Sequence, residues 1–213
     1  MNGKGVSALV KIILLGQPHN RHLEQFFIEN LSKHYCLTAF SDNGVLSVGE
    51  GKSLMLLSLP KLAYCHSDQC INILAPHFKL LDPLPAGTTV IAASDDERQL
   101  KALAKVQIPV ITCGLSSKDT FTFSSKEEES AVVALMRSIK SVYGHTVEPM
   151  EVPITFPPKT DDFTLLSYTA SLILTETISS QNNDLKQEFT SYKTNTSANN
   201  TTANANEKEI KEC

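Results

Sequence analysis

The chain has 213 residues, of which 41% are hydrophobic and 20% are charged, and its net charge at pH 7 is −4. This length suits one packed domain with some chain left over. An acidic chain without tryptophan is not expected to bind nucleic acid or an anionic membrane surface. No apolar stretch approaches the ~20 residues that cross a bilayer. The short apolar run 9–15 contains Lys11 and has no small-residue cleavage site after it, so the sequence predicts a cytoplasmic protein.

The first quarter of the chain alternates strand and helix patterns. Residues 10–16 form an apolar run that ends in Gly16, which is typical of a strand buried on both faces. Residues 21–33 have the spacing of an amphipathic helix. Further strands are expected at 35–40, 45–48 and 54–59, with a tight turn joining the first two.

The middle of the chain contains one ambiguous segment and one clear strand. The apolar residues of 69–81 fit one face of a helix, although Pro76 would break or kink it. Residues 88–93 predict a strand. Ser94 lies three residues before Glu97, which is typical of a capping box, so a helix should follow with Leu100, Leu103 and Ala104 on its inner side.

The remaining elements include a second ambiguous segment. Strands are expected at 109–113 and 120–123, with Gly114 as the turn after the first. Residues 130–142 predict either a β-hairpin with 147–156 or a helix over 129–139. A last helix should begin at Asp161 or Asp162, acting as the cap, and reach about residue 177.

Strands that alternate with helices predict a three-layer α/β domain with a mostly parallel sheet, flanking helices and a C-terminal β-hairpin plus helix. We expect this domain to span residues 1–178. Residues 179–213 are dominated by Asn, Thr, Ser, Lys and Glu and offer almost nothing to bury. They are therefore expected to form a disordered tail.

The carboxyl ends of parallel strands meet at one edge of such a sheet, where α/β proteins bind ligands. The ligand-binding residues expected at this edge are Gly16, Asp95, Asp96, Gly114, Ser116, Ser117 and Lys118. The acidic pair could bond a ribose hydroxyl or hold a metal, or it could simply cap the helix that follows. The turn at 116–119 could bind an anion, or it could be a polar turn between two strands.

No complete catalytic motif is present, so no catalytic residue, metal site or cofactor is predicted. The loop at 17–20 lacks the lysine and the Ser or Thr of a phosphate-binding P-loop. Cys65 and Cys70 flank His66, but one cysteine pair falls short of a four-ligand zinc site. The five cysteines are odd in number and are expected to be reduced.

Residues 90–96 and 110–114, VIAASDD and VITCG, resemble the central domain of the Mur ligase and folylpolyglutamate synthase family. In that family a strand ends in an acidic pair, a helix follows, and the next strand ends in a glycine turn. The resemblance covers about half the chain and implies that residues 11–33 occupy the place of the P-loop strand and helix. The family's Gly-Thr-Asn-Gly-Lys-Thr or Ser loop does not follow the first strand pattern, and the resemblance is expected to be to a shortened relative without the family's C-terminal ligand-binding domain.

These ligases form an acyl phosphate from ATP, which needs a lysine and Mg²⁺ on the transferred phosphate. The resemblance therefore implies a non-catalytic, cytoplasmic relative that binds a protein partner or a small ligand and is linked to cell-envelope metabolism. The alternative is a small nucleotide- or phosphate-binding enzyme that uses the strand edge at Asp95 and Asp96, with Lys118 nearby and with ATP and Mg²⁺ as cofactors. A third hypothesis is a module whose active site is completed by a partner chain.

Overall fold

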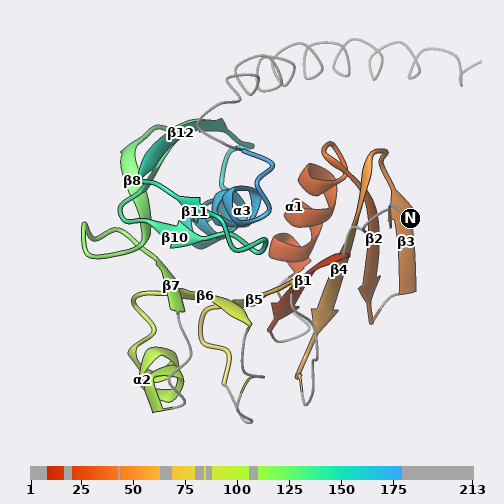
Figure 1. The fold of residues 1–213 in the computed structure, drawn as a ribbon, viewed down its shortest axis with the longest axis horizontal. Coiled ribbons are helices and arrows are strands. Elements are labelled where there is room, and N and C mark those ends of the chain that lie inside the picture. The colour runs from red at the N-terminus through yellow and green to blue at the C-terminus, as the bar shows by residue number, and fades with distance from the viewer. Residues whose placement is uncertain are drawn as a thin grey trace, which may run out of the picture.

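The computed structural model describes residues 9–16, 21–42, 44–62, 69–79, 84, 88–105 and 110–178. Most of its strands belong to one mixed sheet, in the order β12-β9-β8-β7-β6-β5-β1-β4-β2-β3 (Figure 1). The strands from β2 to β8 in this order run parallel, whereas β3 at one end and β9 and β12 at the other are antiparallel to their neighbours. The bounds of its strands are β1 Val10–Leu15, β2 Tyr35–Ser41, β3 Gly44–Val48, β4 Lys52–Leu59, β5 Cys70–Leu74, β6 Thr89–Ala93, β7 Val110–Cys113, β8 Phe121–Lys126, β9 Ser130–Leu135 and β12 Met150–Thr155.

Helices cover both faces of this sheet. Helix α1 (Arg21–Leu31) and helix α3 (Asp162–Leu174) lie on one face, and helix α2 (Glu97–Lys105) lies on the other (Figure 1). A small hairpin of β10 (Ile139–Lys140) and β11 (Thr146–Val147) lies beside α3. The three-layer α/β architecture with a mostly parallel sheet is therefore confirmed. None of the helices in the described ranges is long and apolar enough to cross a bilayer.

The sheet separates a larger core from a smaller one. Ile12 and Leu14 of β1 face the larger core beneath α1 and α3, whereas Ile13 and Leu15 face the smaller core on the α2 side. This alternation explains why the strand is a nearly continuous apolar run, because both of its faces are buried.

Helix α3 is buried around its whole circumference, from Phe163 to Leu174. Its hydroxyl side chains find partners within the helix: Thr169 Oγ1 donates to the Leu165 carbonyl at 2.9 Å, and Ser171 Oγ donates to the Ser167 carbonyl at 2.7 Å. A Ser or Thr can occupy an apolar environment when its own backbone accepts its proton. Asp161 is the N-cap, as predicted, and its side chain accepts the Thr164 N–H at 2.8 Å.

The two ambiguous segments are both strands. Residues 70–74 form β5, which lies between β1 and β6 and is buried at every position. A central strand with both faces covered accounts for this burial, and Pro76 follows the strand without interrupting it. Residues 130–142 contain β9, which pairs with β12, and β10, which pairs with β11 across residues 141–145. The hairpin alternative is therefore confirmed.

The cap of α2 differs from the prediction. Asp96, not Ser94, accepts the Gln99 N–H, so the helix begins two residues later than a Ser94 cap requires. The buried side of α2 consequently carries Gln99 and Leu103, four residues apart, whereas Ala104 is exposed. The tail predicted at 179–213 and the loop at 17–20 lie outside the described residues, and the domain boundary at 178 stays a prediction.

A polar cluster fixes the chain after α3. The carboxylate of Glu176 accepts the Ser141 hydroxyl at 2.5 Å and lies 2.8 Å from Nδ1 of His145. The Ser141 hydrogen bond, supported by His145 and Lys52, lowers the pKa of Glu176 below its usual value. The φ of Glu176 is +56°, a left-handed conformation that a non-glycine residue adopts at some cost.

The mutation Glu176→Gln should therefore change how stability depends on pH. A carboxyl group with a lowered folded-state pKa stabilises the fold above its unfolded-state pKa of about 4.3, and this contribution disappears as the pH falls through the folded-state value. The wild type should exceed the variant in urea midpoint at pH 7, and the difference should shrink at more acidic pH. A difference that is constant with pH would show that the charge of Glu176 is not involved.

Candidate functional site

The carboxyl ends of β5, β6 and β7 bring three loops together. The loop 75–79 follows β5, the loop 94–96 follows β6, and the turn 114–120 follows β7. Two hydrogen bonds hold this edge together: the Ser94 N–H donates to the carbonyl of Cys113, the last residue of β7, at 2.9 Å, and the His77 N–H donates to the Asp96 carboxylate at 2.9 Å. This is the edge at which the sequence predicts a ligand site.

Asp96 joins the first two loops, and Asp95 does not. The Asp96 side chain is buried, with Oδ1 accepting the Gln99 N–H at 3.0 Å and Oδ2 accepting the His77 N–H. Both carboxylate oxygens are therefore engaged by backbone donors. The neighbouring Asp95 side chain is exposed. The acidic pair thus divides into one capping residue and one residue open to solvent.

Gln99 fixes the same loop to α2. Its Nε2 donates to the carbonyls of Ala75 and Phe78, each at 3.2 Å, while its Oε1 is buried and has no hydrogen-bond partner among the described residues. His77, between these two carbonyls, has a φ of +64°. Residues with strained backbones persist only where their surroundings hold them, and they concentrate at binding sites.

A pocket of about 440 Å³ opens between this loop and α2. It is lined by His77, Phe78, Lys79, Asp96, Arg98, Gln99 and Ala102. Lys79 and Arg98 are exposed and carry positive charge, and among the described lining residues the acidic group is the engaged carboxylate of Asp96. The volume lies within the ~300–1,000 Å³ that is usual for small-molecule sites. The described lining of the pocket therefore combines two exposed cationic groups with an apolar surface at Phe78 and Ala102.

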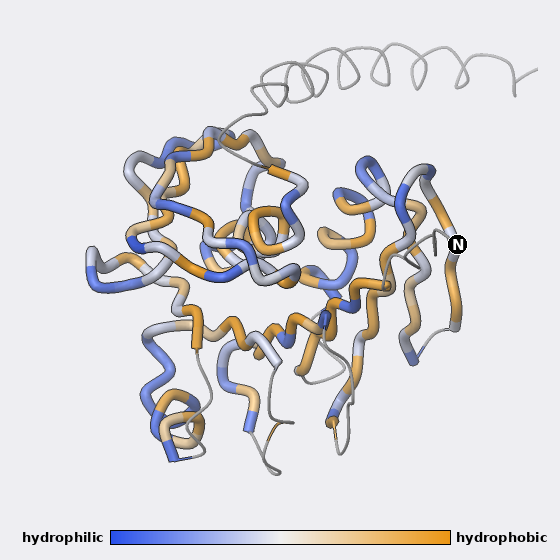
Figure 2. Tube along the Cα trace, in the orientation of Figure 1, coloured by the Kyte–Doolittle hydropathy of each residue, from blue (hydrophilic) through white to orange (hydrophobic). Residues whose placement is uncertain are grey.

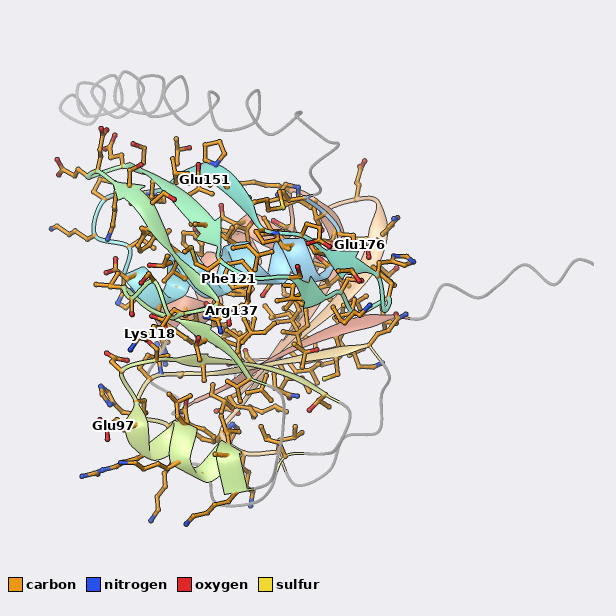
Figure 3. All side chains as sticks on the ribbon, turned by 60° about the vertical axis from the view of Figure 1, so that its left-hand side comes forward. Glu97, Lys118, Phe121, Arg137, Glu151 and Glu176 are labelled. Carbon is orange, nitrogen blue, oxygen red and sulfur yellow. The ribbon has the colours of Figure 1, made fainter. Side chains whose placement is uncertain are left out.

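The turn after β7 is occupied by its own hydrogen bonds. Asp119 is buried and its Oδ2 accepts the Ser116 N–H at 3.0 Å, while Ser116 Oγ accepts the Lys118 N–H at 3.2 Å. Arg137 donates to the carbonyls of Lys118 and Asp119, the second at 3.3 Å; Figure 3 shows Arg137 beside Lys118. The amides of Ser116 and Lys118, which an anion would need, are therefore already bonded.

Gly114 lies against the side chains of Ser94 and Asp119. A Cβ at this position would overlap Ser94 Oγ and lie 2.5 Å from Asp119 Oδ2. Gly16, at the end of β1, lies against the first loop, since a Cβ there would be 2.9 Å from Cβ of Ala75. Both predicted glycines therefore permit close packing at the sheet edge. Ser117, in the same turn as Ser116, is exposed.

Cys113, the last residue of β7, is not suited to nucleophilic chemistry. Burial, reinforced by the negative charge of Asp119, raises the pKa of the Cys113 thiol far above its ordinary value. The thiol is the unreactive form, so Cys113 acts as a small apolar residue. No group of three or more metal-ligating side chains occurs within the described ranges, and Cys65 and His66, which the sequence analysis judged insufficient for a zinc site, lie outside them.

The sequence analysis missed four polar residues of the pocket lining, which are His77, Lys79, Arg98 and Gln99. The first two belong to the segment that could not be assigned to helix or strand. Gln99 was detectable in principle, because it lies four residues before Leu103 on the inner side of α2. Arg98 is one of several charged residues on a short helix, and nothing in its spacing distinguishes it.

No protein-family model matches this chain, and no curated protein matches it. Among solved structures, the chain is similar to the UDP-N-acetylmuramate:L-alanyl-gamma-D-glutamyl-meso-diaminopimelate ligase from Neisseria meningitides, with 11% identity and a TM-score of 0.41. The match covers 78% of this chain and 60% of the ligase, so the chain spans less than two thirds of that protein's length. The ligase is thus a distant structural neighbour.

Proposed function

We propose that this protein is a non-catalytic domain that binds a small anionic ligand in the pocket between residues 77–79 and α2. The observation that carries the proposal is the pairing of two exposed cations, Lys79 and Arg98, across a pocket of ligand size at the carboxyl edge of a parallel sheet. A guanidinium and an ammonium group together favour a phosphate or a carboxylate. The apolar lining at Phe78 suits a ring or a short aliphatic group beside the charge.

A binding role agrees with how the reactive residue types are used. Asp96 is engaged by two backbone N–H groups, and Cys113 holds its proton at neutral pH. Asp96 shapes the edge of the sheet through its hydrogen bonds, and Cys113 does so through buried packing. The hydrogen bonds of Gln99 to the first loop fix the wall of the pocket in advance, which reduces the entropy lost on binding.

The double mutation Lys79→Ala and Arg98→Ala tests this proposal. A thermal-shift panel of inorganic phosphate, ATP and UDP-sugars, each with and without Mg²⁺, should contain at least one ligand that raises the melting temperature. UDP-sugars belong in the panel because the sequence resemblance implies a link to cell-envelope metabolism. Each charge-assisted hydrogen bond contributes about 1.5–3 kcal/mol, so the double variant should bind that ligand at least about a hundredfold more weakly by calorimetry.

Lys101→Ala is the matched control, because Lys101 is exposed on the same helix and pairs with Glu97 outside the pocket. This variant should bind as the wild type does. Equal binding by the double variant and the wild type would disprove the pocket as the site. A response that requires Mg²⁺, is abolished by Asp95→Ala and is accompanied by turnover of the ligand would instead support the enzyme alternative at the Asp95 and Asp96 edge.

A further inference from the structure

Strand β3 is an open edge of the sheet. It pairs only with β2 among the described strands, and all five of its residues are exposed. Three of them are apolar, with exposed fractions of 65% at Val45, 47% at Leu46 and 38% at Val48. The strand carries no charged residue and no proline. Figure 2 shows β3 as a largely hydrophobic stretch along the right-hand margin of the molecule.

The opposite edge of the sheet is protected. Strand β12 has Glu151 and Pro153 among its exposed positions. Charged side chains and prolines at an edge prevent another strand from pairing there. The sheet therefore blocks strand addition at β12 and leaves it open at β3. An unprotected apolar edge of this kind marks a surface that another strand covers.

The register of the hairpin shows which backbone groups are free. Ser41 and Gly44 close a two-residue connection and form a hydrogen-bonded pair. Because hydrogen-bonded pairs recur at every second residue of an antiparallel ladder, Leu46 and Val48 also direct their backbone N–H and C=O groups toward β2. Val45 and Ser47 lie between them and direct their N–H and C=O groups toward the open edge. The Ser47 side chain lies 3.5 Å from that of Thr38, as expected of a pair that is not hydrogen-bonded through its backbone.

We propose that the occupant of this edge is β3 of a second copy of the chain, added antiparallel about a two-fold axis so that the two sheets become continuous. With Ser47 opposite its own symmetry mate, Leu46 of each copy lies across from Val48 of the other on the face that α1 covers. The backbone groups of Ser47 pair with each other at the axis. Aliphatic cross-strand pairs stabilise such a junction.

The charge pattern of the strand favours a second copy over a different partner. Self-pairing of a strand usually places like charges opposite each other, and β3 avoids this because none of its residues is charged. A different peptide partner could not be recognised through charge complementarity, because β3 has no charged residue. A five-residue junction is small, within the class of interfaces below about 1,200 Å² that associate transiently. The dimer should therefore depend on protein concentration.

Sedimentation over a wide concentration series tests the proposal, which does not depend on the ligand pocket. The wild type should shift from monomer to dimer, and Leu46→Lys should raise the dissociation constant about tenfold or more, because each of two symmetric contacts loses an apolar pair. Leu115→Lys is the matched control, since Leu115 is 72% exposed in a turn outside the edge strand. It should dimerise as the wild type does. A wild type that stays monomeric throughout, or a Leu46→Lys variant that dimerises equally, would overturn the proposal.

Hydrogen exchange provides a second measurement that does not require a variant. The amides of Val45 and Ser47 should exchange more slowly as the protein concentration rises, whereas those of Leu46 and Val48, bonded to β2, should be protected throughout. Protection of Val45 and Ser47 in the monomer would mean that another segment of the same chain covers the edge. Fast exchange of the Val45 and Ser47 amides at every concentration would mean that a second copy does not cover the edge, which would then be available to a different protein. Either result contradicts dimerisation through β3.

Discussion

The mutation Gly114→Ala is expected to lower the free energy of unfolding by about 2–4 kcal/mol in urea denaturation. The added methyl group would overlap Ser94 Oγ and press on the buried carboxylate of Asp119. Overpacking at a rigid site costs about 1–3 kcal/mol, and displacing Asp119 weakens its hydrogen bond to the Ser116 N–H, for about 1 kcal/mol more. Because the φ of Gly114 lies outside the left-handed region, the cost comes from these contacts and not from the backbone.

A double-mutant cycle with Ser94→Ala separates this explanation from a general loss of packing. Removing the Ser94 hydroxyl takes away the atom that the new methyl group would overlap, so the double variant should recover a large part of the lost stability. Gly144→Ala is a useful contrast, since Gly144 has a φ of +87° and no atom near a Cβ. It should lose only about 1 kcal/mol through backbone strain. Purely additive effects of Ser94→Ala and Gly114→Ala would contradict the contact explanation.

The mutation Asn72→Leu is expected to raise the free energy of unfolding by about 1–3 kcal/mol, in the opposite direction from most core substitutions. Asn72 is fully buried in β5, between Ile13 of β1 and Val90 of β6. Neither its Oδ1 nor its Nδ2 has a hydrogen-bond partner among the described residues. An unpartnered buried amide retains its full desolvation cost, and leucine has nearly the same volume without that cost.

Asn30→Leu is the matched control for this result. Asn30 is also buried, but its Nδ2 donates to the Phe26 carbonyl at 2.8 Å and its Oδ1 accepts from Lys33 Nζ at 2.8 Å. Removing a partnered amide should lower stability by about 1 kcal/mol. Opposite signs for the two asparagines would support the distinction, whereas a loss of stability on Asn72→Leu would show that the Asn72 amide is hydrogen-bonded after all.

The parts of the fold that depend on local pattern could be predicted from the sequence. The apolar runs of β1 and β6 are buried on both faces, which distinguishes them from half-buried strands. The aspartate pair at 161–162 supplied the cap of α3, and the turn at 41–44 supplied the β2–β3 hairpin. In each of these cases, the residues that determine the element lie within a few positions of one another.

The details of the candidate site depend on contacts between distant residues and could not be predicted in this way. Asp96 caps the helix in place of Ser94 because the Asp96 carboxylate also accepts the N–H of His77, which lies 19 positions earlier in the chain. Gln99 forms the pocket wall through carbonyls of the same distant loop. The sequence did not identify β5 as a strand because Asn72 is a polar residue within a run whose two faces are both buried. The spacing of residues along one segment contains no information about such partners.

The position of α3 in the chain has a consequence for synthesis. This helix fills the centre of the larger core, yet it is the last described element to leave the ribosome. The hydrogen bond from the Tyr35 hydroxyl to Thr175 Oγ1, 2.9 Å long and spanning 140 residues of sequence, can therefore form only late in synthesis. Until then the apolar face of the nascent parallel sheet has nothing to pack against at its centre. Folding that depends on such distant contacts is slow and exposes apolar surface to aggregation. Growing chains of this protein are therefore expected to need chaperone protection until α3 has emerged.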